Sequence, residues 1–186
     1  MDEIDDFKKT LESIREKIIN DEPFTDELNN FFNNYNTDEG KINVVVKKLE
    51  ENSILPNYNY GGDSGFDLFS TIDIEIESFE RALIPTGLSF SIPDNTEIQI
   101  RSKSGLALKE GIFVLNSPGT IDSSYNGEIK VILFNTSKNT FLVKKNMKIA
   151  QAVICPVFCG SSISFVESNN LKNTERGNKG FGSTGM

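Results

Sequence analysis

Residues 128–135, EIKVILFN, form a mostly apolar run that is flanked by glycine and small polar residues. A short apolar run with such boundaries is typical of a buried strand. IDIEIE at residues 72–77 and EIQIR at residues 97–101 alternate apolar with charged or polar residues, which is the pattern of a strand with one buried face. Further strands are predicted for INVVVKK (42–48) and FLVKK (141–145).

Glycine, proline, asparagine and aspartate interrupt these strands at short intervals from residue 41 onward. Many short strands separated by turn signals favour an all-β sandwich, jelly roll or barrel. The length of 186 residues suits one domain of ordinary size, with or without an appendage.

The first 40 residues differ from the rest in charge and in periodicity. They hold 12 acidic and 4 basic residues, whereas residues 41–186 hold 15 of each, so the net charge of −8 belongs to this segment. Five apolar residues repeat at spacings of three and four: Ile4, Phe7, Leu11, Ile14 and Ile18. A second amphipathic stretch follows Pro23, and together the two predict a short helical hairpin. Its apolar faces must pack on something, for which we favour the protein's own assembly; an outside partner remains open.

Composition excludes several function classes. The chain has no histidine, so a Ser-His-Asp triad, a Cys-His dyad and a His-ligated zinc site are ruled out. Residues 41–186 have no basic excess, and we therefore expect no nucleic-acid partner. No run approaches the ~18 apolar residues of a membrane span, so we expect no membrane partner. The opening MDEIDDFKK resembles neither a signal nor a transit peptide, which predicts a cytoplasmic or other intracellular protein.

Five segments are candidates for chemistry: SGFDL (64–68), RSKSGLA (101–107), NSPGTIDSSYNGE (116–128), KIAQ (148–151) and RGNKGFGSTG (176–185). The second mixes cations, hydroxyls and a glycine, as in a loop that binds phosphate oxygens. The third lies between two apolar strands, and we interpret it as a hairpin with a carboxylate and an aromatic ring at its edge. The fifth reads as a mobile tail that could wrap a polyphosphate.

In this order the five segments resemble the five motifs of the trimeric dUTP nucleotidohydrolase (dUTPase) family, over about residues 42–186. The resemblance implies an all-β, jelly-roll-like barrel or sandwich subunit of a homotrimer, with active sites shared between subunits. It also implies a dUTP diphosphatase, in which water attacks the α-phosphorus of dUTP and releases dUMP and pyrophosphate. This reaction limits dUTP and supplies dUMP for thymidylate synthesis. The chain would then comprise an acidic helical extension (1–40), a β-barrel core (41–172) and a flexible glycine-rich arm (173–186) that closes over an active site.

The resemblance also implies roles for individual residues. Asp122 matches the catalytic aspartate, and a carboxylate can deprotonate water without histidine. The residues implied for uracil and deoxyribose are Asn116, Gly119, Thr120, Ile121, Tyr125 and Phe181. Those implied for the phosphates are Lys103, Ser104, Gly105, Gln151, Arg176, Gly182, Ser183 and Thr184. Mg²⁺ would be held through phosphates and water, with Asp67 supporting that water shell or a neighbouring arginine.

Two departures from the family pattern affect basic residues. Lys103 and Lys148 stand where the family usually has arginine, and lysine lacks the planar fork that orients a phosphate. We expect the change at Lys148 to affect stability more than chemistry. Two alternatives stay open: a dCTP deaminase of the same fold, and a nucleotide-gated regulatory protein that binds a partner through its N-terminal helices.

Overall fold

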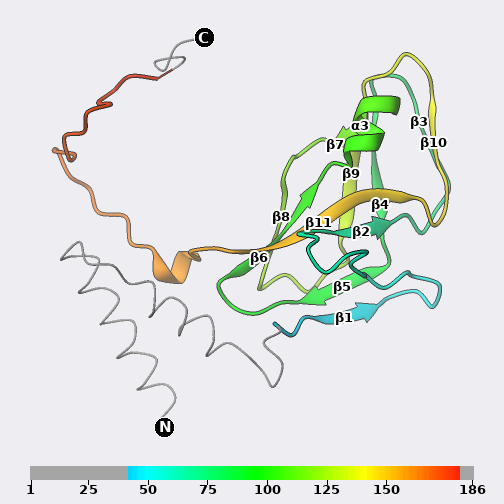
Figure 1. Ribbon diagram of the computed structural model, residues 1–186, viewed down its shortest axis with the longest axis horizontal. Coiled ribbons are helices and arrows are strands. Elements are labelled where there is room, and N and C mark those ends of the chain that lie inside the picture. Colours follow the sequence, from blue (N-terminus) through cyan, green and yellow to red (C-terminus); the bar gives the residue numbers. More distant parts are fainter. Residues whose placement is uncertain (1–41, 181–186) are drawn as a thin grey trace, which may run out of the picture.

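The computed structural model describes residues 42–180, and the predicted helical hairpin of residues 1–40 lies outside this range, as do residues 181–186. Within it the regular secondary structure consists almost entirely of strands (Figure 1). They are β1 (Val45–Lys48), β2 (Phe66–Phe69), β3 (Ile74–Ile76), β4 (Arg81–Pro85), β5 (Leu88–Ser91), β6 (Thr96–Arg101), β7 (Ile112–Val114), β8 (Gly119–Asp122), β9 (Lys130–Asn135), β10 (Phe141–Val143) and β11 (Lys148–Pro156). One short helix, α3 (Ser104–Glu110), follows β6, and a 3₁₀ turn, η1 (Gly160–Ser162), follows β11.

The strands form antiparallel sheets that enclose one apolar core. The largest sheet has the order β2-β11-β6-β8, a second has the order β4-β9-β7, and β1 pairs with β5 as β10 pairs with β3. Ile98 and Ile100 of β6 face the core from the first sheet, and Val131 and Leu133 of β9 face it from the second. The all-β fold that the sequence predicts is confirmed.

The third of the five candidate segments, residues 116–128, connects the two larger sheets. β7 and β9 pair antiparallel, as expected for a hairpin. The residues between them do not form a simple loop, because Gly119–Asp122 becomes β8 and pairs with β6 in the other sheet. The hairpin is thus anchored to both larger sheets, which fixes Asp122 at the end of a strand.

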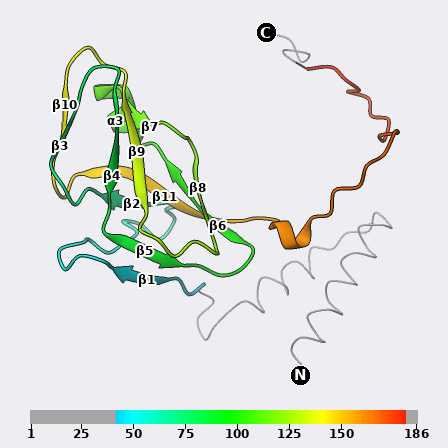
Figure 2. The ribbon, with the colours of Figure 1, turned by 180° about the vertical axis from the view of Figure 1, so that it is seen from behind.

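The chain leaves the barrel after β11. Apart from η1, residues 157–180 have no regular secondary structure, and they lead away from the barrel in both views (Figures 1 and 2). This segment carries large apolar side chains that are more than 80% exposed: Phe158, Phe165, Val166 and Leu171. Such exposure is unusual for a chain in isolation. Among the described residues, no helix is long and apolar enough to cross a membrane.

Candidate active site

Three of the five segments meet at one end of the largest sheet, around the Asp67 carboxylate. Lys148 Nζ of β11 lies 2.6 Å from Asp67 Oδ2, and Lys103, just before α3, donates to Asp67 Oδ1. Gln151 lies opposite Asp67 in the ladder between β11 and β2. We call Asp67, Lys103, Lys148 and Gln151 the Asp67 cluster. Both lysines that replace family arginines therefore share one carboxylate, in place of the arginine that the resemblance implied for Asp67.

The environment of Asp67 stabilises its charged form. Burial raises the pKa of this carboxyl, but the hydrogen bonds and positive charges of Lys103 and Lys148 outweigh burial and hold the pKa below the usual 3.8. The side chain of Asp67 is 12% exposed and that of Lys148 is 47% exposed, so water screens the carboxylate less than it screens the Lys148 ammonium group. The two ammonium groups and one carboxylate leave a net positive charge that can attract a phosphate.

Asp67→Asn should destabilise the protein by about 1 to 2 kcal/mol at pH 7, because two ammonium groups would then face a neutral amide. Since the folded pKa of Asp67 is depressed, its contribution is fully present above the unfolded pKa of about 3.9 and is lost as pH falls through the lower folded pKa. Urea unfolding of both proteins at pH 7 and pH 3 measures the difference, which should shrink at pH 3. Asp94→Asn, at an exposed turn, is the control. An equal loss at both pH values would contradict the ion-pair explanation.

Ser104 and Gly105 occupy the first turn of α3, where both are exposed. A Cβ added at Gly105 would meet no described atom within 4 Å, so neighbouring side chains do not require glycine there. The N–H groups of a first helical turn have no partner within the helix and can bind an anion. The space over Gly105 thus lets a ligand approach the backbone beside Lys103.

Ser102 supports the Asp67 cluster, and sequence reasoning assigned it no role. Its carbonyl accepts a hydrogen bond from Gln151 Nε2 at 2.9 Å, and its Oγ accepts one from the Val114 N–H at 3.0 Å. These contacts join the start of α3 to β11 and β7. The position of Ser102 just before Lys103 was the only signal in the sequence.

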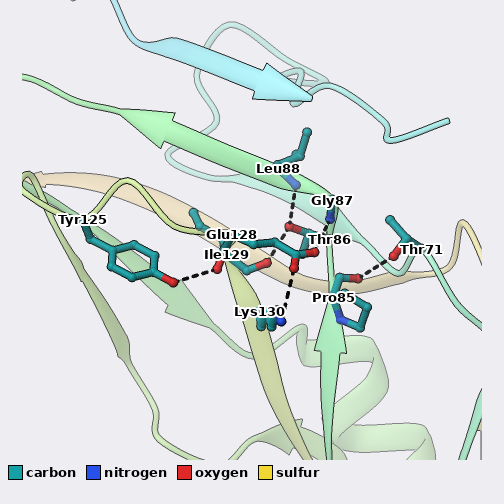
Figure 3. A network of polar contacts seen from close by, with 9 residues as sticks. All are labelled: Thr71, Pro85, Thr86, Gly87, Leu88, Tyr125, Glu128, Ile129 and Lys130. Atoms are coloured by element: carbon teal, nitrogen blue, oxygen red, sulfur yellow. Dashed lines mark hydrogen bonds and ion pairs between the residues drawn. The ribbon is translucent and has the colours of Figure 1, made fainter. Parts of the chain in front are cut away.

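Asp122 and Tyr125 lie together at the exposed end of β8. The Tyr125 N–H donates to the Asp122 carbonyl at 3.0 Å, which closes a tight turn after the strand. The Tyr125 hydroxyl donates to the Glu128 carbonyl at 3.0 Å (Figure 3). A Cβ added at Gly127 would lie 2.5 Å from Tyr125 Cζ, so the phenol ring packs directly on this glycine.

Asn116 lies at the opposite end of β8. A Cβ added at Gly119 would lie 3.3 Å from Asn116 Nδ2, so the amide packs beside this glycine. The side chains of Asn116, Thr120 and Asp122 are exposed, whereas Gly119 is buried against β6. The amide, the carboxylate and the Tyr125 phenol therefore line one exposed edge of the protein.

A single chain does not bring the Asp122 end of this edge to the Asp67 cluster, although Gly119 at the other end pairs with Ile100, next to Arg101. Gln151 is opposite Arg101 on β6, whereas Asp122 is opposite Glu97, four residues further along the same strand. That offset corresponds to about 13 Å along the strands and about 10 Å across them. Arg176 is further away in sequence, in the exposed C-terminal segment, where its Nε donates to the Lys179 carbonyl at 3.0 Å. Phe181, Gly182, Ser183 and Thr184 lie outside the described residues.

Comparison with known proteins identifies the family to which this chain belongs. A family model described as dUTPase matches residues 51–185, which include all five segments. A deoxyuridine 5'-triphosphate nucleotidohydrolase from Clostridium kluyveri is 51% identical over 144 residues, which cover 77% of this chain and 99% of the relative. Fold and matches together define an all-β nucleotide hydrolase. The chain belongs to the dUTPase family.

Solved structures agree in fold. The dUTPase of Staphylococcus bacteriophage 80alpha, solved with dUPNHPP, has a TM-score of 0.71 and 27% identity, and covers 77% of this chain and 99% of its own. A variant of the dUTPase from phage phi11 of S. aureus has a TM-score of 0.65 and 24% identity, over 70% of this chain and 99% of its own. That phi11 protein is described as coordinating a structural Mg(II) ion.

Proposed function

We propose that this chain is a dUTP diphosphatase, which hydrolyses dUTP to dUMP and pyrophosphate and so limits dUTP and supplies dUMP for thymidylate synthesis. The observation that carries this function is the dUTPase family match over residues 51–185. The C. kluyveri relative, which is named for this activity, supports it at 51% identity. An intracellular location agrees with a substrate that cells make internally.

Asp122 is the general base in this proposal. Its carboxylate takes a proton from a water molecule, the oxygen of that water bonds to the α-phosphorus, and the bond from the α-phosphorus to the bridging oxygen breaks. Pyrophosphate leaves with the electron pair of that bond. The exposed carboxylate at the end of β8 is free to meet a ligand there.

Specificity for uracil and deoxyribose belongs to the same edge. Asn116 offers an amide that matches the polar edge of uracil, and a cytosine would leave buried polar groups unpaired. Gly119, Thr120 and Ile121 offer backbone groups beside it. The Tyr125 ring packs on the deoxyribose, where a ribose 2′-hydroxyl would clash, and Phe181 of the arm stacks on the base.

The phosphates are held by residues from three segments. Lys103, Ser104 and Gly105 contact them at the start of α3, and Gln151 holds the α-phosphate region. The arm adds Arg176, Gly182, Ser183 and Thr184. Mg²⁺, when bound, neutralises part of the charge of the triphosphate. The Asp67 carboxylate already contacts the ammonium groups of Lys103 and Lys148, so we propose that it supports the water shell of Mg²⁺ and does not coordinate the ion directly.

We further propose a homotrimer in which each site draws on more than one subunit. The offset of about 13 Å along β6 between Asp122 and the Asp67 cluster supports this, since both must act on one α-phosphate. The exposed apolar side chains of residues 157–171 suit a segment that packs on another subunit. The arm would then order over the nucleotide and exclude water.

Gly127→Ala tests the Tyr125 assignment, because a methyl group there would overlap the phenol ring and displace it. We expect the ratio of kcat/KM for dUTP over UTP to fall by about tenfold. Steady-state pyrophosphate release from both nucleotides measures the ratio. Gly62→Ala, where an added Cβ meets nothing within 4 Å, is the control. An unchanged ratio in Gly127→Ala would remove Tyr125 from sugar selection.

The function is tested by pyrophosphate release from dUTP, dTTP, dCTP and UTP, each with Mg²⁺ and after EDTA. Release from dUTP alone, abolished by EDTA, is expected. Ammonia release from dCTP would favour the deaminase alternative, against which the family match argues. Tight dUTP binding without turnover would favour the regulatory alternative.

Residues 1–40 form an accessory extension in this proposal, residues 41–172 hold the barrel and the segment that leaves it after β11, and residues 173–186 form the arm. The dUTPase family match begins at residue 51, so the extension lies outside it. Deletion of residues 1–40 should leave turnover and the number of subunits in the assembly unchanged. Loss of the assembly would instead make the extension a structural brace.

A further inference from the structure

We infer that Glu128 is a positioning residue that sets the preference for deoxyribose over ribose by fixing Tyr125. The inference rests on the proposed function, which gives Tyr125 its role against the sugar. Glu128 itself lies one residue beyond Gly127, at the entrance to β9, and sequence reasoning assigned it no role. Its two polar ends, the backbone carbonyl and the side-chain carboxylate, hold different parts of the molecule (Figure 3).

The backbone of Glu128 binds Tyr125 directly. Its carbonyl accepts the Tyr125 hydroxyl at 3.0 Å. The N–H of the same peptide group, which belongs to Ile129, donates to the Leu88 carbonyl at 2.8 Å. The peptide that receives the phenol is therefore held against β5, and a hydrogen bond to it fixes the tip of the ring.

The side chain of Glu128 anchors this peptide to the bend between β4 and β5. Its Oε1 accepts the Gly87 N–H at 2.9 Å, and its Oε2 lies 3.3 Å from Lys130 Nζ. The side chain is 21% exposed, so the carboxylate is mostly removed from water. A charge-assisted hydrogen bond to a backbone N–H in such a setting is stronger than a neutral one.

The bend that Glu128 holds has little freedom of its own. Gly87 has a φ of +65°, and a Cβ there would overlap Ser53 Oγ, so a residue with a side chain is not easily accommodated. Thr86 Oγ1 donates to the Ile129 carbonyl at 2.7 Å and accepts the Leu88 N–H at 3.3 Å. Glu128 thus ties the Tyr125 ring to a rigid part of the barrel.

Rigidity of the ring matters because selection against a 2′-hydroxyl is steric. A ring that can move aside makes room for the hydroxyl and loses discrimination, whereas the rest of the nucleotide still binds. Removing the Glu128 carboxylate should therefore change selectivity more than it changes turnover of dUTP. A purely structural role would lower stability without changing selectivity.

The test compares wild type with Glu128→Ala, Glu128→Asp and Glu128→Gln in two assays on the full chain. One assay is kcat/KM for dUTP and UTP with Mg²⁺, and the other is Kd for dUMP and UMP by calorimetry. The ratios of dUTP over UTP and of dUMP over UMP should fall by about tenfold in the Ala and Asp variants. The Gln variant should keep most of both ratios, since its amide oxygen still accepts the Gly87 N–H.

Glu77→Ala is the matched control, because the Glu77 carboxylate also accepts one hydrogen bond, from Thr140 Oγ1 at 2.7 Å, beside the β3–β10 sheet, to which β8 does not belong. It should leave both ratios unchanged. Ratios equal to wild type in Glu128→Asp and Glu128→Ala, or equal changes in Glu77→Ala, would overturn the inference. If Glu128→Ala does not fold, the Asp and Gln pair decides it.

The two assays separate the inference from the proposed function. The wild-type protein could bind dUMP more tightly than UMP and yet release no pyrophosphate from dUTP. That result would contradict the proposed function, while the binding ratios would still test the role of Glu128. Wild type that releases pyrophosphate, with variants that keep both ratios, would defeat the inference alone. Wild type with no preference for dUMP over UMP and none for dUTP over UTP would overturn the inference, whereas pyrophosphate release from dUTP would still support the function.

Discussion

Asp122→Asn should lower the rate of dUTP turnover by ~10²-fold or more while leaving dUTP binding nearly normal. The amide keeps the shape of the side chain but cannot take a proton from water. Because Asp122 is exposed at the end of β8, its replacement should not unfold the protein. Single-turnover pyrophosphate release gives the rate of the chemical step, and calorimetry gives the affinity.

Glu97→Gln is the matched control for Asp122→Asn, since Glu97 lies opposite Asp122 in the ladder between β6 and β8. It removes a neighbouring carboxylate from the same region and should leave the rate within a few-fold of wild type. A rate for Asp122→Asn equal to wild type would remove Asp122 from the role of base. An equally large fall in Glu97→Gln would point to the shared charge of the pair instead.

A chain that ends at residue 175 should fold and assemble but turn over dUTP at least ~10²-fold more slowly. The last barrel strand ends at Pro156, and the hydrogen bonds of Arg176 and Lys179 are local to the described part of the arm. Circular dichroism, light scattering and kcat/KM measure fold, mass and activity. An unfolded product would make the arm structural, and unchanged activity would remove it from the site.

The truncated chain and Asp122→Asn also test shared sites when they are refolded together. Each is inactive for a different reason: one lacks the arm and the other lacks the base. If a site takes these parts from different subunits, mixed assemblies contain some complete sites and activity returns. Mixtures that form mixed assemblies but stay inactive would contradict a shared site.

The fold class was predictable because several strands have a recognisable local pattern of apolar residues. Alternation in EIQIR predicts Ile98 and Ile100 as the buried face, and both are buried. Boundaries were less certain: IDIEIE forms a strand only over Ile74–Ile76, and EIKVILFN enters β9 only at Lys130. Helix α3 was not predicted, since it has only seven residues and includes a glycine in its first turn.

The site was predictable only in its parts. The resemblance assigned Asp67, Lys103 and Lys148 to three motifs, but no local pattern indicates that both lysines meet one carboxylate, which depends on strand pairing. Strand β8 was not predicted for the same reason: it pairs with β6, which belongs to a different sheet from β7 and β9. In the sequence Glu128 is an ordinary residue at the start of a strand, and only the structure shows that its carboxylate accepts the Gly87 N–H. The roles given to residues 1–40 and 181–186 stay predictions.

The length of chain between the last barrel strand and Arg176 determines how far the residues that we propose to bind the phosphates can reach. Residues 157–175 separate the end of β11 from Arg176 and include only the three residues of η1 in regular structure. A flexible chain of this length reaches about 24 Å on average. If the arm binds the phosphates as proposed, it would act as a tethered ligand whose local concentration is of millimolar order. Opening and closing of the site would therefore depend on the length of the tether, and would be independent of how much protein the solution contains.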